Sequence, residues 1–144
     1  MSEAYQTDIV EWSEEQAALL RRLAAGERVN DQIDWPNVIE EIESVGNEQV
    51  HAVSSLLTQA IIHRLKAMAW PKARDADNWR AEAVRFAGDA ADRFVPSMRQ
   101  RLDVARLYRR ALRAVPATMY GEQRPLLPPE CPWSLDELLE HDAP

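Results

Sequence analysis

The stretch IDWPNVIEEIESVGNEQVHAVSSLLTQAIIHRLKAMAW, residues 33–70, decides the fold. Its apolar positions from Trp35 to Met68 recur at helical spacing, and no proline interrupts them after the first turn. Pro36 is tolerated in that turn because the N–H it lacks would have no helical partner there. The pattern therefore predicts one continuous helix over residues 35–69, about 50 Å long at 1.5 Å per residue.

The two halves of this predicted helix differ in their apolar pattern. In the first half Val38, Ile42 and Val45 share one side, which we take as the core-facing direction. Gly46 costs about 1 kcal/mol relative to alanine and favours a kink or a close helix crossing. Residues 53–70 carry apolar side chains around nearly the whole circumference, so this half belongs in the centre of a helical bundle.

Capping residues and prolines mark the other helices. Asp8 with Glu11, and Ser134 with Glu137, have the spacing of a capping box, which satisfies free N–H groups at a helix start. Gly26 is placed to end the first helix. The predicted helices span residues 8–25, 35–69, 78–94, 97–115 and 135–140. No stretch alternates as a strand would, so the expected fold is all-α, in one domain over residues 1–144.

A proline-rich segment, GEQRPLLPPECPW at residues 121–133, precedes the last helix. The apolar side chains in and after it are Leu126, Leu127, Trp133, Leu135, Leu138 and Leu139. Burial of each large side chain contributes about 1.5–3 kcal/mol, and prolines reduce the entropy lost on ordering. We therefore predict a helical bundle around one long central helix, closed by a proline-rich C-terminal strap and a short closing helix.

Composition agrees with an ordinary globular chain. Its 144 residues are 46% hydrophobic and 28% charged, which is close to average usage for one domain. No apolar run approaches the roughly 20 residues needed to cross a bilayer, and the start MSEAYQTDIVEW has no signal-peptide pattern. Cys131 is the sole cysteine, so no disulfide forms within the chain. These features predict a cytoplasmic protein that is not embedded in a membrane.

Charge is segregated along the chain. Residues 1–50 carry 12 acidic and 3 basic side chains. Residues 51–113 carry 6 acidic and 13 basic side chains, and residues 114–144 carry 6 acidic side chains and 1 basic one. A basic middle between acidic ends is able to hold phosphates, but such segments also neutralise one another across packed surfaces. We favour internal neutralisation over an anion site.

Acidic residues near the start of the long helix form the first candidate site. Glu40, Glu41 and Glu43, beside Asn37, have the side chains of a divalent-metal or acid–base site. Helical phase places Glu40 opposite the core direction and Glu43 well to one side, which favours a solvated acidic face. The Glu-x-x-His spacing at residues 48–51 resembles half of a di-iron motif, but no second copy occurs. We therefore predict no bound metal and no cofactor.

His63 is the first choice if the chain has a catalytic or ligand-binding centre. It falls near the core-facing side of the long helix, with Gln49 and Lys66 as possible neighbours. Imidazole titrates in the physiological range and suits proton transfer, but a buried histidine is more often a hydrogen-bonded structural residue.

A basic corner at residues 66–85 is the last candidate. It contains Lys66 and Arg80 together with Trp70 and Trp79, a combination able to bind phosphates and to stack on bases. The tryptophans fall where a turn joins two helices, which favours a role as core anchors. The net charge of −7 also argues against attraction to nucleic acid.

Motifs along nearly the whole chain carry a family resemblance. They are Tyr5-x-x-Asp8-x-x-x-Trp12, EQAALLR at residues 15–21, IDWPNVIEEIESVGNE at 33–48, His63-Arg64-Leu65-Lys66 before Trp70, Trp79-Arg80, Pro96-Ser97-Met98 and PPECPWSLDELL at 128–139. With these the chain resembles the bacterial domain-of-unknown-function family numbered twenty-nine. Arg64, at a usually aliphatic position, and Pro116, in a usually helical region, depart from its pattern. The resemblance implies an all-helical bundle and supplies no catalytic residue.

These observations favour a cytoplasmic protein-interaction or accessory module without catalytic activity, which binds a protein partner or a second copy of itself. Two alternatives remain. One is an enzyme with a His63-centred or glutamate-based metal site, and the other is nucleic-acid or phosphate binding through residues 66–85.

Overall fold

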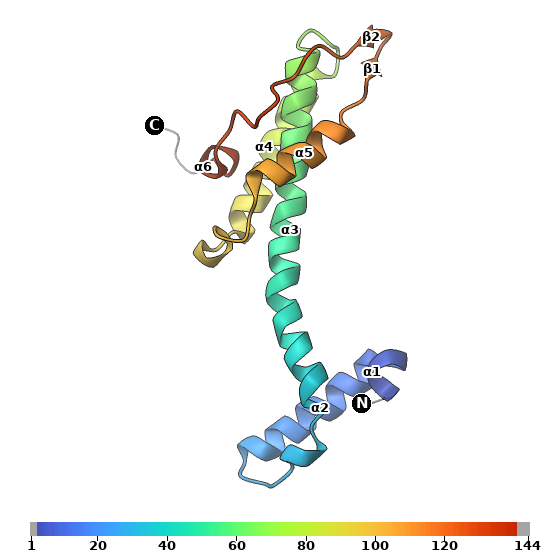
Figure 1. Ribbon diagram of the computed structural model, residues 1–144, viewed down its shortest axis with the longest axis vertical. Helices are drawn as coiled ribbons and strands as arrows, with labels where there is room; N and C mark the ends of the chain where they lie inside the picture. Colours follow the sequence, from blue (N-terminus) through green and yellow to red (C-terminus); the bar gives the residue numbers. More distant parts are fainter. Residues whose placement is uncertain (1–2, 141–144) are drawn as a thin grey trace. The chain divides into compact units, whose positions relative to one another are not determined.

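The computed structural model describes residues 3–140, and most of them are helical (Figure 1). The helices are α1 (Glu3–Thr7), α2 (Ile9–Ala24), α3 (Trp35–Ala69), α4 (Ala76–Arg93), α5 (Val104–Ala114) and α6 (Leu135–Leu138). Short 3-10 helices η1 (Asn30–Gln32) and η2 (Pro96–Met98) lie in the connections, and β1 (Thr118–Met119) pairs with β2 (Glu122–Gln123). The predicted all-α class is confirmed.

Helix α3 spans the predicted residues 35–69 without a break. Gly46 is helical and exposed, so the helix tolerates it without ending there. The chain divides into two compact units whose boundary falls inside α3, between Glu48 and Gln49. The single-domain organisation therefore stays a prediction, and one cooperative unfolding transition for both units would support it.

The N-terminal unit packs α2 and the start of α3 around a small core. Buried Trp12, Ile33 and Val38 form its centre. Asp8 caps α2 as predicted, because its side chain accepts a hydrogen bond from the Glu11 N–H at 3.0 Å. Gly26, at φ +96°, provides the left-handed backbone that ends the helix. The short helix α1, before this cap, was not predicted.

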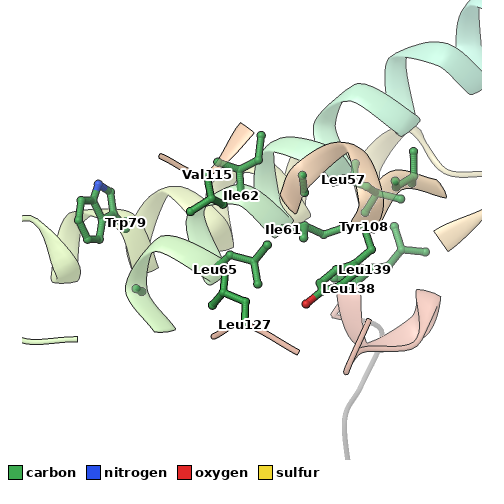
Figure 2. Close-up of a cluster of buried hydrophobic side chains, with 14 of the residues drawn as sticks. Leu57, Ile61, Ile62, Leu65, Trp79, Tyr108, Val115, Leu127, Leu138 and Leu139 are labelled. Carbon is green, nitrogen blue, oxygen red and sulfur yellow. The ribbon is translucent and has the colours of Figure 1, made fainter. Parts of the chain in front are cut away.

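The C-terminal unit has a larger core, in which the second half of α3 is central (Figure 2). Leu57, Ile61 and Leu65 are fully buried. They pack with side chains of α4, α5 and the C-terminal segment, including Tyr108 and Leu138. This arrangement explains the apolar circumference of residues 53–70, because several elements pack around that half of the helix.

The prediction of one helix over residues 97–115 is wrong. Pro96 opens only the short η2, and α5 begins after Asp103, whose carboxylate accepts from the Arg106 N–H at 3.2 Å. An aspartate at this position satisfies a free N–H and starts a new helix. Likewise α4 starts at Ala76, two residues ahead of the predicted start at residue 78.

The predicted C-terminal strap is present and docked. The Tyr108 hydroxyl donates to the Pro128 carbonyl at 2.6 Å, while Leu138 and Leu139 are buried. Leu126 was expected to pack with them but is 99% exposed, because the extended segment turns its side chain outward. The two-residue strands β1 and β2 were not predicted either. They are too short to show alternation, and positive φ angles at Tyr120 and Gly121 form the turn between them.

Candidate functional site

A buried polar network ties the N-terminal unit together. Asp34 Oδ2 accepts from the Trp12 indole N–H at 3.0 Å and from the Asn37 amide at 2.8 Å. The Asp34 backbone N–H donates to Gln16 Oε1 at 2.8 Å. Asn37, predicted as a candidate site residue, and Gln16 are both buried. Since these groups satisfy one another, the network is suited to holding α2 against α3.

Tyr5 lies beside this network. Its hydroxyl donates to Glu41 Oε1 at 2.6 Å, and its ring packs edge-on against Trp12 with centroids 4.8 Å apart. The hydrogen bond to Glu41 raises the pKa of Tyr5 to about 12, with smaller contributions from burial and neighbouring carboxylates. The motif residues Tyr5, Trp12 and Asp34 thus share a structural role.

We expect the Tyr5 phenol to titrate with a pKa of about 12 instead of 10.0. Because the folded-state pKa lies above the unfolded value, this contribution to stability is complete below about pH 10 and is lost as the pH rises through about 12. Tyrosinate absorbance, taken as the difference between the protein and Tyr5→Phe, measures the titration. Glu41→Gln removes the charge and should move the pKa toward 10.0; a phenol already titrating there in the unchanged protein would contradict the assignment.

An exposed apolar stripe runs along the first half of α3. Ile39, Ile42 and Val45 are 51%, 68% and 63% exposed, and we name these three residues the α3 stripe. The prediction that Ile42 and Val45 face the core is therefore wrong. Val38 alone of that predicted set is buried, because it packs with Trp12 and Ile33, whereas the later turns on the same side of the helix are uncovered.

Acidic residues border the α3 stripe. With 100° per residue, Glu43 falls on one side of it and Glu48 on the other, and both are exposed. Gly46 falls on the same side of the helix at the C-terminal end of the stripe, where it permits close approach of another chain. Glu40 is also exposed, on the far side of the helix, and Gln49 is exposed beyond the stripe. Glu40 and Glu43 are thus solvent-exposed as predicted, whereas Glu41 is half-buried and accepts the Tyr5 hydrogen bond.

His63 is half-buried, and its ring is engaged locally. Nδ1 lies 2.8 Å from the Gln59 carbonyl one turn earlier, and the ring is 5.4 Å from that of Phe86. Gln49 is 14 residues away on the same helix, about 21 Å at 1.5 Å per residue, so it is no neighbour of His63. Lys66 directs its ammonium over the Trp79 ring instead, at 5.9 Å. These three candidates do not converge on one point.

The basic corner is partly a core structure. Trp70 and Trp79 are buried with ring centroids 6.5 Å apart, as predicted for core anchors. Arg80 pairs with Asp77 at 2.8 Å. A groove of about 530 Å³ lies beside Trp70. Its lining includes Lys72, Arg74, Tyr120 and Glu122. The groove therefore mixes both signs of charge.

A second basic surface lies on α5 and was not predicted. Its members are Arg106, Arg109, Arg110 and Arg113, all exposed, and we name them the arginine face. Their i, i+3, i+4, i+7 spacing puts them on one side of the helix, opposite the buried Leu107, Tyr108 and Ala111. The spacing is visible in VARLYRRALRA, residues 104–114, whereas the predicted basic corner covers only residues 66–85.

Within residues 3–140 no three His, Cys, Asp or Glu side chains form a group suited to a metal ion. In the same range no helix combines the length and apolar character that crossing a membrane requires. Cys131 is a free thiol, and burial raises its pKa.

Residues 4–143 match the family described as domain of unknown function DUF29. The chain belongs to this family. The predicted resemblance is thereby confirmed. The matched residues of this DUF29 protein include Trp12 and Asp34 of the polar network and the neighbouring Tyr5. The chain is also similar to a crystallised alpha-helical protein of unknown function from Rhodospirillum rubrum, with 29% identity and a TM-score of 0.70 over 99% of this chain and 92% of that one. No curated protein matches it.

Proposed function

We propose that this DUF29 chain is a cytoplasmic protein-interaction module without catalytic activity, which associates with a second copy of itself through the α3 stripe. The observation that carries the proposal is the exposure of Ile39, Ile42 and Val45 on successive turns of one helix. Exposed apolar side chains are ordinary when single, whereas a continuous row bordered by charges is typical of an interaction surface.

Two features make the α3 stripe suitable for association. The α3 stripe lies on one continuous helix, so little backbone entropy is lost when it binds a partner. Burying the exposed parts of its three large side chains contributes roughly 1 kcal/mol for each. Gly46, directly after Val45, carries no side chain that would obstruct a partner at this end of the stripe.

A second copy is the favoured partner because the chain carries both signs of charge in separate regions. Residues 3–48 hold 12 acidic and 3 basic side chains, whereas α5 alone presents four exposed arginines. Opposite charges on two copies promote encounter and fix its orientation.

The alternative functions draw less support from the geometry. A His63-centred enzyme needs partner groups beside the imidazole, but Lys66 lies over the Trp79 ring and Gln49 is about 21 Å away along the helix. Phosphate binding at residues 66–85 needs free guanidinium groups, whereas Arg80 is paired with Asp77 and Arg85 with Glu82.

The test is the concentration dependence of self-association, measured by analytical ultracentrifugation into the high micromolar range. Ile42→Glu places a charge in the α3 stripe and should weaken association by about tenfold or more, since each 1.4 kcal/mol changes the constant tenfold. Val84→Glu is the matched control, because Val84 is an exposed apolar residue of α4, 55% accessible. A chain that is monomeric throughout, or equal effects of both substitutions, would refute the proposal.

A further inference from the structure

The arginine face of α5 is fixed by the packing of the opposite side of the same helix. Leu107, Tyr108 and Ala111 are buried, so α5 has one orientation in its unit and directs the four arginines outward. Arg106 to Arg113 spans seven residues, about 10.5 Å at 1.5 Å per residue. Four guanidinium groups thus form a short, rigidly mounted cationic row.

These four arginines have no carboxylate partner within residues 49–140, the described part of their own unit. Other arginines there are paired, such as Arg99 with Asp136 at 2.8 Å and Arg85 with Glu82 at 2.5 Å. Like charges at i, i+4 spacing destabilise a helix by a few tenths of a kcal/mol for each pair. An anionic surface placed against α5 would remove this repulsion.

The α3 stripe of the N-terminal unit matches this row in length and charge. Ile39 to Val45 spans six residues, about 9 Å, and Glu43 and Glu48 border the stripe on opposite sides. Arginine is suited to such a surface, because its aliphatic stem covers apolar side chains while the guanidinium reaches carboxylates at the edge.

We propose that the arginine face of α5 docks on the α3 stripe of a second copy, so that the two copies meet through different surfaces. This inference rests on the proposed function and names its contact. A symmetric contact of α3 stripe with α3 stripe would bring two acidic units together, which like-charge repulsion opposes. A contact between unlike surfaces leaves one arginine face and one stripe free in a dimer, so association continues to larger species or closes into a ring.

The experiment is a charge exchange between two full-length variants. One carries Arg109→Glu with Arg110→Glu, and the other carries Glu43→Arg with Glu48→Arg. Alone, each should self-associate at least about tenfold more weakly than the unchanged protein in sedimentation equilibrium. When the two variants are mixed, their association constant should be within about threefold of that of the unchanged protein. The reason is that the reversed stripe of one variant faces the reversed arginine row of the other.

Controls separate this contact from unfolding and from general charge effects. Circular dichroism checks that each variant is helical, and Arg109→Lys with Arg110→Lys should retain association. Lys72→Glu with Arg93→Glu makes the same charge change at exposed positions away from α5 and should leave self-association unchanged.

Three outcomes would overturn the inference. If Ile42→Glu weakens association but the arginine reversal does not, the proposed function stands and the α5 contact is wrong. If the chain is monomeric throughout, both fail. If a labelled single-stranded oligonucleotide binds through Arg109 and Arg110 while self-association is unaffected by their reversal, the arginine face serves phosphates instead.

Discussion

Leu138→Ala is expected to lower the free energy of unfolding by about 2–5 kcal/mol. Leu138 is fully buried, and it comes from α6, a helix of four residues. A helix of this length has no stability of its own and depends on packing. Losing the Leu138 side chain leaves a cavity and also releases the hold on α6, so the strap should loosen at the same time.

Thermal unfolding and limited proteolysis measure this effect. A loss of 3 kcal/mol corresponds to a fall in Tm of about 10 °C for a chain of this size, with new cleavage expected in residues 125–140. Leu126→Ala is the matched control, since it truncates the same residue type in the same strap where the side chain is 99% exposed. It should change stability by less than about 0.5 kcal/mol. Equal effects of the two substitutions would contradict the docked strap.

Asp34→Ala is expected to destabilise the N-terminal unit by about 3 kcal/mol. The substitution removes the acceptor of the Trp12 indole N–H and the Asn37 amide, and both of these residues are buried. A buried donor left without an acceptor destabilises the fold by its full desolvation free energy. This loss is larger than the net free energy that an exposed hydrogen bond contributes. The damage should be confined to α2 and the first half of α3.

Residue-resolved amide hydrogen exchange measures this local loss, together with the fluorescence of Trp12. Asp31→Ala, in the preceding η1, removes the same charge at an exposed position and should leave exchange in α2 unchanged. Asp34→Asn keeps an acceptor oxygen and should cost less than Asp34→Ala. Unchanged protection of α2 in Asp34→Ala would show that the network does not hold the unit together.

Local signals in the sequence were sufficient for most helices. Unbroken apolar spacing predicted α3 over residues 35–69, and the Asp8 and Ser134 caps were placed correctly. The helix predicted over residues 97–115 begins directly after Pro96, whereas Asp103 caps the start of α5 in the structure. Both residues are typical helix starts, and only the tertiary packing of Met98 and Leu102 decides that the chain turns between them.

The candidate site was harder to predict because exposure depends on what covers a face. Helical phase puts Val38, Ile42 and Val45 on one side, yet it cannot show that α2 covers only the first of them. Arg109 and Arg110 were visible as residues, but their significance depends on their forming no ion pair within residues 49–140. That is a property of the folded chain, which spacing alone does not determine.

Folding of the chain is expected to begin in the second half of α3. Starting a helix is unfavourable, with a nucleation factor of about 10⁻³, whereas adding a residue to an existing helix is not. Val53 and Leu57 are fully buried, so packing stabilises the first turns there. Growth toward Trp35 then needs no second nucleus and takes nanoseconds per residue. Helix α2 accordingly meets a partner helix already formed, and refolding of the N-terminal unit should be limited by the docking of α2 onto Val38 and Asp34.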